Sequence, residues 1–355
     1  MAKRVFVGMS GGVDSSLSAA LLKKQGYDVT GVYMKNWSRD LPGMKCPWRQ
    51  DYTDAKRVAV QLGIPFEMYD FEKQYRSVVV DYMLRSYQAG LTPNPDIMCN
   101  QEIKFGLFFD LATKNGADFV ATGHYARTLE NKDGSGLYEA VCKDKDQSYF
   151  LYRVNYRILD RVLMPIGEFE TKEEVRKLAA KYGLSTAEKP DSQGICFVGE
   201  IGIKDFLLEF LGPQPSGDII DQSGRIVGRH DGSIFYTIGQ RHGLDLGGGL
   251  PFYVTGKDVK KNIVYVTTDL QDRNLWSRVV KIKNLHWLSE DIPKLIKSRE
   301  LSVRTRYRSA KVACRARIED DSAVLELEDE VRALTPGQSA VIYLGEQVLG
   351  GGIIY

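Results

Sequence analysis

The chain has 355 residues, enough for about two or three domains, and 43% of them are hydrophobic and 26% charged. This composition excludes a disordered chain, a collagen-like repeat and a small module held together by disulfides. The 48 basic and 46 acidic side chains leave a net charge of +2, so the molecule as a whole lacks the charge typical of nucleic-acid-binding proteins. Any polyanionic partner must therefore be met by a local patch.

No apolar run approaches the roughly 18 residues that a membrane-spanning helix needs. The first residues, MAKRVFVGMSGG, lead directly into a strand-like segment and a glycine turn, without the apolar core of a signal peptide. We therefore expect a cytoplasmic protein with no membrane partner. The five cysteines are widely spaced and include no CxxC pair, which favours reduced thiols over a disulfide framework, a structural zinc site or an iron–sulfur cluster.

The first half of the chain alternates between strand-like and helix-like segments. The predicted strands are 4–9, 28–36, 64–71 and 116–126, and the predicted helices are 13–26, 53–63 and 172–183. Such alternation predicts an α/β fold with a doubly wound parallel sheet to about residue 165. For the helix at 172–183, Thr171 is the expected N-cap, with Glu174 at capping-box spacing.

The character of the sequence changes beyond about residue 212, where Gly, Pro and Asp become frequent and short alternating segments predict a small β-rich domain. From about residue 276, six strand-like segments follow one another at close spacing, as in a sandwich or a small barrel. We therefore expect three domains, at residues 1–205, 206–275 and 276–355.

The sharpest motif is SGGVDSS at residues 10–16, between the first strand and the first helix. Its glycines and serines offer backbone N–H groups and hydroxyls at a helix N-terminus, and it lacks the lysine of a Walker A loop. The loop therefore suits a pyrophosphate group, with Asp14 as the expected Mg²⁺ ligand. The alternative is a serine-rich turn with an Asx cap. The motif resembles the PP-loop of ATP pyrophosphatases, which cleave ATP to AMP and pyrophosphate and attach AMP to a substrate oxygen.

Two cysteines lie in contexts that favour reactivity. Cys99 follows a loop rich in proline and asparagine and precedes a helix expected to begin near Asn100 or Gln101, whose dipole would stabilise a thiolate. Cys196 follows a Pro-Asp-Ser-Gln-Gly turn. Because turns tend to expose side chains, we expect both thiols to be accessible, although a small buried hydrophobe is the alternative for each.

The other three cysteines carry weaker signals. Cys142 and Cys314 lie inside strand-like runs, where packing is at least as good an explanation as chemistry. Cys46 lies in a loop with two tryptophans and mixed charges, and its role stays open.

Nine segments match a known family in order along essentially the whole chain. They are GMSGGVDSS (8–16), MKNW (34–37), TPNPDIMCNQEIKFG (92–106), ATGHYAR (121–127), DKDQSYFL (144–151), DSQGICFVG (191–199), GRHDG (228–232), YTIGQRHGL (236–244) and TPGQ (335–338). Together they resemble the bacterial tRNA-specific 2-thiouridylases. That family has an N-terminal PP-loop domain, a small central domain and a C-terminal β-barrel.

The resemblance implies a two-step thiolation of the wobble uridine of tRNA. ATP, with Mg²⁺, first adenylates the C2 oxygen of the uracil, and a cysteine persulfide then delivers sulfur to C2. By their positions in the motifs, Cys196 is the expected persulfide carrier and Cys99 the partner thiol, which closes a disulfide as sulfur is released. The implied partners are tRNA and an upstream persulfide donor, either a cysteine desulfurase or a relay protein.

The resemblance also assigns binding residues. The expected ATP contacts lie at the carboxyl ends of strands: Gly8, Met9, Ser10, Gly11, Gly12, Val13, Asp14, Ser15, Met34 and Gly123. The expected tRNA contacts are Asn94, Pro95, Asp96, Lys145, Asp146, Gln147, Arg306 and Tyr307. His124 is either a catalytic base or a turn residue that supports the nucleotide.

A basic segment near the C-terminus offers the local patch that the net charge hides. Its basic residues are Lys297, Arg299, Arg304, Arg306, Arg308, Lys311, Arg315 and Arg317, with Glu300 as the only acid. The alternation of Arg304, Arg306 and Arg308 predicts three guanidinium groups on one strand face, available to phosphates. The alternative is a solvated sheet face.

Two other functions stay open on these residues. A PP-loop amidotransferase or synthetase acting on a small molecule would use ammonia and would need neither the two loop cysteines nor the basic segment. A non-catalytic RNA-binding protein would tolerate the loss of Ser10, Asp14, Cys99 and Cys196.

Overall fold

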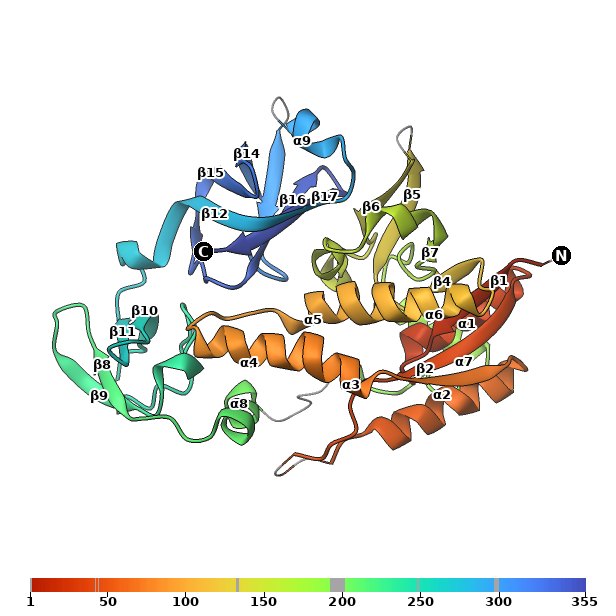
Figure 1. The fold of residues 1–355 in the computed structure, drawn as a ribbon, viewed down its shortest axis with the longest axis horizontal. Coiled ribbons are helices and arrows are strands. Elements are labelled where there is room, and N and C mark those ends of the chain that lie inside the picture. Colours follow the sequence, from red (N-terminus) through yellow and green to blue (C-terminus); the bar gives the residue numbers. More distant parts are fainter. Residues whose placement is uncertain are drawn as a thin grey trace.

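The computed structural model describes residues 2–41, 43, 45–131, 134–191, 202–247, 249–296 and 300–355, which form three sheets with helices around the first (Figure 1). The predicted α/β fold with a small β-rich central part and a C-terminal barrel is confirmed. Among these residues, no helix has both the length and the apolar character that crossing a bilayer requires.

The first sheet is parallel and has the order β3-β2-β1-β4-β7. Its strands are β1 (Arg4–Gly8), β2 (Asp28–Lys35), β3 (Phe66–Asp70), β4 (Phe119–Ala121) and β7 (Val162–Leu163). The order runs outward from β1 in both directions, so the sheet is doubly wound and its switch point lies between β1 and β4. Ligands of open α/β sheets bind at the carboxyl ends of the strands at such a point.

Helices cover both faces of this sheet because β1 is apolar on both sides. Val5 and Val7 pack with α1 (Val13–Lys24), α2 (Trp48–Leu62) and α7 (Lys172–Lys181), whereas Phe6 packs with the helices of the other face. The expected cap of α7 is confirmed, since the Thr171 hydroxyl accepts from the Glu174 N–H at 3.2 Å. The helix predicted at 53–63 is α2, which begins earlier, at Trp48.

Two long helical runs lie side by side over the second face (Figure 1). One consists of α3 (Glu72–Tyr75), a π-helical stretch η1 (Arg76–Val80) and α4 (Asp81–Gln88), and the other of α5 (Pro95–Met98), a π-helical stretch η2 (Cys99–Leu107) and α6 (Phe108–Lys114). The expectation of a helix starting near residue 100 is wrong. Asn94 caps the second run and Pro95 takes its first position, the arrangement that starts helices best, so residues 95–98 are already helical.

The central part begins with α8 (Ile203–Leu211) and forms a four-stranded sheet of order β10-β11-β8-β9. Its strands are β8 (Gly217–Ile220), β9 (Ile226–His230), β10 (Tyr253–Asp258) and β11 (Ile263–Thr267). The remaining short helices of the described chain are η3 (Lys143–Lys145), η4 (Ser148–Leu151), η5 (Tyr156–Arg161), η6 (Ser233–Phe235), η7 (Arg273–Leu275) and α9 (Ile292–Leu295).

Six antiparallel strands close into the C-terminal barrel through the pairing of β12 with β17. They are β12 (Trp276–Trp287), β13 (Leu301–Arg304), β14 (Val312–Glu319), β15 (Ser322–Arg332), β16 (Ser339–Leu344) and β17 (Gln347–Ile354). A hairpin from the first half of the chain, β5 (Ala126–Asn131) and β6 (Gly134–Glu139), extends the barrel sheet by pairing Leu137 with Val348. The sequence had not indicated this hairpin, which joins the first part of the chain to the last.

Candidate active site

The loop after β1 is built for close approach of a ligand to its backbone. Gly11 has φ +79°, and a β-carbon there would collide with the carbonyl oxygen of Asp51, so only glycine fits. The Ser15 hydroxyl accepts from the Ser10 N–H at 3.1 Å and fixes the loop. Among the described residues no side chain caps α1 at Gly12, so the N–H groups of its first turn remain available to an anion.

The structure brings the expected ATP contacts together from three strands. A β-carbon on Gly8, at the end of β1, would lie 2.9 Å from Cε of Met34 on β2. A β-carbon on Gly123, after β4, would lie 2.6 Å from the Ser15 nitrogen. The carboxyl ends of β1, β2 and β4 therefore meet around the start of α1, at the switch point of the sheet.

Asp14, the expected magnesium ligand, is already engaged by the protein. Both of its carboxylate oxygens accept from Lys172 Nζ at 2.7 Å, and Oδ1 also accepts from the Tyr125 hydroxyl at 3.0 Å. Lys172 is buried, and burial together with Asp14 raises the pKa of Tyr125, so the phenol stays a hydrogen-bond donor. In this arrangement Asp14 does not fit the role of a metal ligand, because a lysine already neutralises its charge.

Asp191 is a second acceptor in the same cluster, and sequence reasoning gave it no role. It accepts from Lys172 Nζ at 2.9 Å, from Arg176 at 2.9 Å and from Lys145 at 3.1 Å. Burial would raise the pKa of Asp191, but the bonds from Lys172 and Lys145 outweigh it and lower this pKa. No short motif signals these contacts, because they join residues up to 46 positions apart.

Cys99 is neither at a helix N-terminus nor accessible, contrary to expectation. It lies within the helical run that starts at Pro95, and only 2% of its surface is exposed. The N-terminal dipole therefore does not act on its thiol in the expected way, since that effect fades beyond the first turn. Cys196, the expected persulfide carrier, lies outside the described residues.

The three other cysteines have surroundings that agree with their contexts in the sequence. Cys314 is buried in the barrel, and burial raises the pKa of its thiol to about 12, which confirms a packing role. Cys142 is a half-buried free thiol that packs against the core to which β1, α1, α2 and α7 contribute. Cys46 is also half-buried, and its Sγ donates to the Trp37 carbonyl at 3.5 Å.

The expected tRNA contacts before Cys99 form the start of a helix. Asn94 Oδ1 accepts from the Asp96 N–H at 3.1 Å, and Pro95 is buried at the first helical position. Burial raises the pKa of Asp96, with Lys104 opposing that effect in part.

The second expected tRNA segment is largely occupied by contacts within the protein. Asp146 is buried and accepts from Arg304 at 2.7 Å and from Ser148 Oγ at 2.9 Å. Gln147 Oε1 accepts from the Tyr125 N–H at 3.0 Å. Since Lys145 bonds to Asp191, this segment supports the nucleotide loop in the structure as it stands.

The expectation of three guanidinium groups on one strand face is wrong. Strand β13 ends at Arg304, whose guanidinium is buried against Glu139 and Asp146 at 2.9 and 2.7 Å. Arg306 donates to the carbonyls of Ile238 and Ala333 at 2.8 and 2.9 Å, and Arg308, at φ +63°, lies in a turn. The alternation assumed a strand that continues beyond residue 304.

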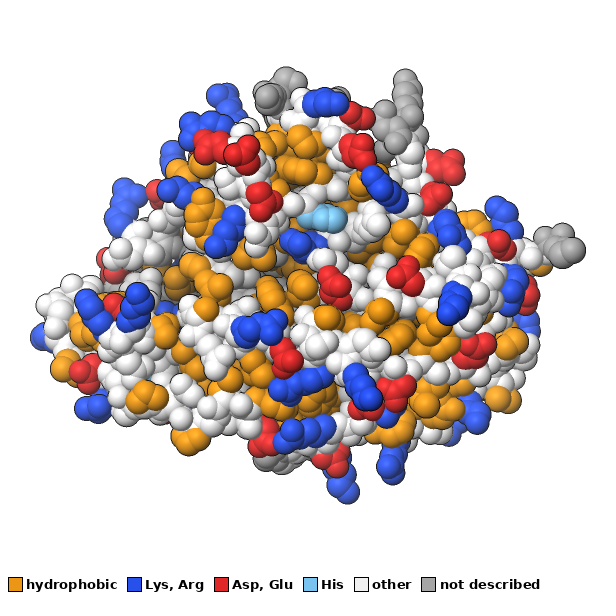
Figure 2. Space-filling view, viewed as in Figure 1, with side chains coloured by type: hydrophobic (Ala, Val, Ile, Leu, Met, Phe, Trp, Pro, Cys, Tyr) orange, Lys and Arg blue, Asp and Glu red, His pale blue; other side chains and the backbone are white. Residues whose placement is uncertain are grey.

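Other basic residues of this segment reach solvent on β14 or lie beyond the described chain. Arg315 and Arg317 are exposed, and Lys297 and Arg299 lie outside the described residues. Tyr307, an expected tRNA contact, packs against Phe150 in a tilted arrangement with ring centroids 4.3 Å apart. On the face shown in Figure 2, basic and acidic side chains are interspersed and no field of a single sign is visible.

His124 supports the loop in its neutral form. Burial, and secondarily Lys104, hold its pKa well below the usual value for histidine. Nε2 lies 3.4 Å from Lys104 Nζ, and because an ammonium group only donates, Nε2 must accept and Nδ1–H must donate to the Thr122 hydroxyl at 2.8 Å. Both ring nitrogens are therefore engaged by the protein, one by Thr122 in the turn and the other by Lys104 on η2, which favours the supporting role over that of a base.

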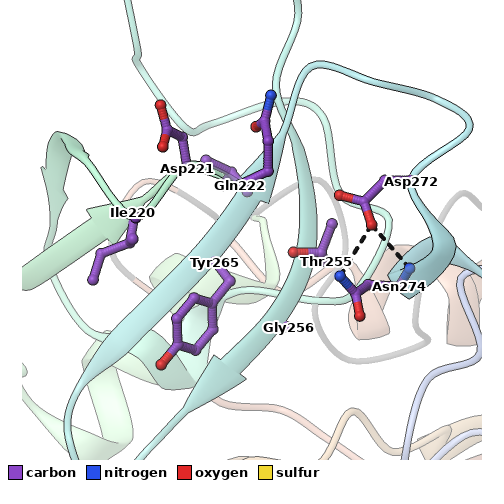
Figure 3. Close-up of a pocket in the computed structure, with 10 residues that line it drawn as sticks. Ile220, Asp221, Gln222, Thr255, Gly256, Tyr265, Asp272 and Asn274 are labelled. Atoms are coloured by element: carbon purple, nitrogen blue, oxygen red, sulfur yellow. Dashed lines mark hydrogen bonds between the residues drawn. The ribbon is translucent and has the colours of Figure 1, made fainter.

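A cavity of about 410 Å³ lies in the central part of the chain, lined by β8, β10, β11 and residues 272–274 (Figure 3). Asp272 and Asn274 bond to each other there at 2.9 and 3.0 Å, and Asp221 is held by its own turn through Ser223. None of the expected catalytic or binding residues lines this cavity. It therefore carries no role in the site.

Comparisons with known proteins cover nearly the whole chain. Three family models match: the tRNA methyl transferase HUP domain at residues 3–200, the tRNA methyl transferase PRC-barrel domain at 204–268 and the aminomethyltransferase beta-barrel domain at 277–354. A "tRNA-specific 2-thiouridylase MnmA" of Bacillus subtilis is 46% identical over 99% of this chain and 94% of its own length. Proteins of the same name from Limosilactobacillus reuteri and Listeria monocytogenes are 44% and 47% identical, each over 99% of this chain and 95% and 94% of their own lengths.

Proposed function

This chain belongs to the tRNA-specific 2-thiouridylase family, and on that basis we propose that it is a tRNA-uridine 2-sulfurtransferase that forms 2-thiouridine at the wobble position. The observation that carries the proposal is the nucleotide loop, where the ends of β1, β2 and β4 meet at the uncapped start of α1. Such a loop binds the phosphates of ATP through backbone N–H groups. The ten expected ATP contacts are proposed on this ground.

The description of the matching family models refers to methyl transfer, whereas the relatives are named for thiolation. Methyl transfer needs neither a pyrophosphate loop nor two cysteines in family motifs. The glycine-serine loop and the segments carrying Cys99 and Cys196 therefore favour thiolation. The same segments argue against a small-molecule amidotransferase, and near full-length relatives named as enzymes argue against a non-catalytic RNA-binding protein.

In the proposed reaction, the uracil C2 oxygen attacks the α-phosphate of ATP and pyrophosphate leaves, so that the oxygen becomes part of a good leaving group. The terminal sulfur of a Cys196 persulfide then bonds to C2 as AMP departs. Cys99 attacks Cys196 Sγ, which forms a disulfide and leaves sulfur on C2. A thiol reductant must restore both cysteines before the next turnover, and an upstream desulfurase or relay protein must reload Cys196.

Mg²⁺ bound to ATP would neutralise phosphate charge. Because Asp14 is paired with Lys172, we propose that the ion enters on the phosphates and that the chain contributes backbone N–H groups of the loop. Lys172 and Tyr125 meanwhile hold Asp14 in place, so the first turn of α1 keeps its orientation towards the phosphates.

We propose the domain limits 1–205, 206–275 and 276–355.

We also propose that tRNA binds over three surfaces of the protein. Asn94, Pro95 and Asp96 would meet the extruded uracil, since a base must leave its stack to be modified. Lys145 and Gln147 would reach tRNA only by exchanging their present partners, and Asp146, Arg306 and Tyr307 would act by shaping the surface around them. A cytoplasmic location follows from the substrate and is proposed with it.

The test uses purified protein, ATP, Mg²⁺, a persulfide donor and unmodified tRNA, with 2-thiouridine measured by mass spectrometry of the nucleosides. We expect Cys196→Ser and Cys99→Ser to abolish thiolation with tRNA binding nearly unchanged, because each removes a sulfur that the reaction needs. Cys142→Ser, at a half-buried free thiol, is the matched control and should stay active. Full thiolation by Cys196→Ser would show that the persulfide assignment is wrong.

A further inference from the structure

Lys172 sits between two carboxylates that belong to different parts of the site. Its Nζ lies 2.7 Å from both oxygens of Asp14, in the first turn after the nucleotide loop, and 2.9 Å from Oδ1 of Asp191. Asp191 is the last described residue before the segment that carries Cys196. One buried amine therefore joins the ATP loop to the chain that leads to the expected sulfur carrier.

The chain around Asp191 is fixed by a second set of contacts. Arg176, one turn further along α7, donates to the carbonyls of Ala187 and Lys189 at 2.8 and 2.9 Å. Lys189 Nζ bonds to Asp51 and Asp54 of α2 at 2.7 Å each. Since the Asp51 carbonyl packs over Gly11, residues 187–191 are tied to the nucleotide loop from two sides.

The geometry gives Lys172 a positioning role rather than that of a phosphate ligand. Two carboxylates balance its single charge, because Nζ lies 2.7 Å from both oxygens of Asp14 and 2.9 Å from Oδ1 of Asp191. The residue is buried and occupies the first position of α7, directly after the Thr171 cap, so its stem cannot swing far. Its charge therefore holds the chain at Asp14 and the chain at Asp191 at a fixed spacing.

We propose that Lys172 and Asp191 form a positioning pair that fixes the start of the Cys196-bearing segment relative to the ATP loop. Sulfur delivery then depends on Asp191, whereas adenylation of the uridine needs Lys172 and Asp14 but not Asp191. This inference rests on the proposed thiolation reaction. It assigns Asp191 to the sulfur-transfer step alone. A misplacement of about 1 Å can lower the rate of a reaction ~100-fold even when the reacting atoms themselves are unchanged.

The experiment separates the two half-reactions in the full-length protein. Adenylation is followed as tRNA-dependent exchange of labelled pyrophosphate into ATP, and the complete reaction as 2-thiouridine formed with a persulfide donor. For Asp191→Asn we expect exchange within about threefold of the unchanged protein and thiolation lowered by about tenfold or more, because the substitution removes the charge with which Lys172, Arg176 and Lys145 pair. Lys172→Met should lower both, because it also leaves the Asp14 charge unpaired.

A double-mutant cycle and two further variants complete the test. Thiolation by Lys172→Met/Asp191→Asn should be no lower than by Lys172→Met alone, since the pair acts as one unit. Asp191→Glu, which keeps the charge, should recover thiolation at least in part. Lys177→Met, on the exposed side of α7, is the matched control and should leave both rates unchanged.

The outcomes distinguish this inference from the function on which it rests. Unchanged thiolation in Asp191→Asn, or an equal fall of exchange and thiolation, would overturn the positioning pair while leaving the enzyme's activity established. Absence of 2-thiouridine with the unchanged protein would overturn the proposed function itself. A melting curve for Asp191→Asn separates a local effect from loss of the fold, and if that variant unfolds, the comparison of Asp191→Glu with Lys177→Met decides.

Discussion

Cys99 presents a contradiction at the scale of the single residue. A thiol that must attack a disulfide-like sulfur needs access, yet Cys99 is 2% exposed in the middle of a helical run. The run is π-helical from Cys99 to Leu107, a rare conformation that is found frequently at functional sites. We infer that binding of tRNA changes this stretch and uncovers the thiol.

Alkylation kinetics test that inference. In the protein without tRNA, we expect iodoacetamide to modify Cys99 much more slowly than the half-buried Cys142, because the reagent cannot reach a buried sulfur. Addition of tRNA should accelerate modification of Cys99, as measured by mass spectrometry of peptides. Cys314, buried in the barrel, should stay slow under both conditions. Rapid labelling of Cys99 without tRNA would contradict a closed resting state.

At the scale of the element, the turn after β4 acts as a support for the nucleotide loop. Gly123 packs so closely on Ser15 that a β-carbon would approach the backbone nitrogen to 2.6 Å. The neighbouring His124 and Tyr125 fix the turn through Thr122 and Asp14. The position of the ATP loop therefore depends on a segment more than a hundred residues away in the sequence.

The substitution Gly123→Ala measures this dependence. The added methyl group meets backbone atoms that cannot yield, so we expect the turn to move away from α1 and ATP binding to weaken by about tenfold or more. Isothermal titration with ATP and Mg²⁺ checks the expectation. Gly247→Ala, where nothing lies within 4 Å, is the control and should bind ATP normally. Normal ATP binding by Gly123→Ala would show that the turn is not a support.

Elements with strong local patterns were predictable from the sequence. Strand β1, helix α1 and strand β2 lie within two residues of their predicted limits, since apolar periodicity and glycine turns mark both ends. The helix start at Pro95 has its own signal, an asparagine followed by proline, but these two residues are also typical of loops. The β5–β6 hairpin could not be predicted, because its pairing with β17 is a long-range contact.

The residues of the site fall into the same two groups: those that a local motif marks and those that only the folded chain brings together. The residues of the ATP loop could be named from one motif, because a glycine turn between strand and helix determines its own geometry. Lys172 and Asp191 could not be found, because only the folded sheet places them beside Asp14. The basic segment failed for a related reason, since a buried acid on β6 takes Arg304 out of solvent.

At the scale of the whole molecule, a buried charge cluster joins the first and last parts of the chain. Glu139, on β6, is 2% exposed in its side chain and bonds to Arg304 and Lys311 at 2.9 Å each, with Lys143 at 3.4 Å. Both Arg304 and Lys311 come from the barrel region. The relative position of the barrel and the parallel-sheet part is therefore set by electrostatics as well as by strand pairing.

Glu139→Gln tests this junction. Removing this carboxylate charge takes away one of the two buried acids that pair with Arg304 and also the acid that pairs with Lys311, so we expect the free energy of unfolding to fall by about 3 kcal/mol, as measured by urea denaturation. Glu346→Gln removes a carboxylate of the same network that is 51% exposed, and it should cost less than ~1 kcal/mol. Equal losses from the two substitutions would contradict a role for burial at the junction.

The β5–β6 hairpin has a consequence for how the chain is made. Strand β6 is synthesised about two hundred residues before its partner β17, and the pair Leu137 and Val348 closes one of the longest loops in the molecule. Until residues 347–354 leave the ribosome, β6 presents an edge with unsatisfied backbone groups, which other chains can pair with. The strand that covers this edge is therefore made long after β6, so the pairing of Gln347 and Val348 with β6 protects the nascent protein from association as well as extending the barrel sheet.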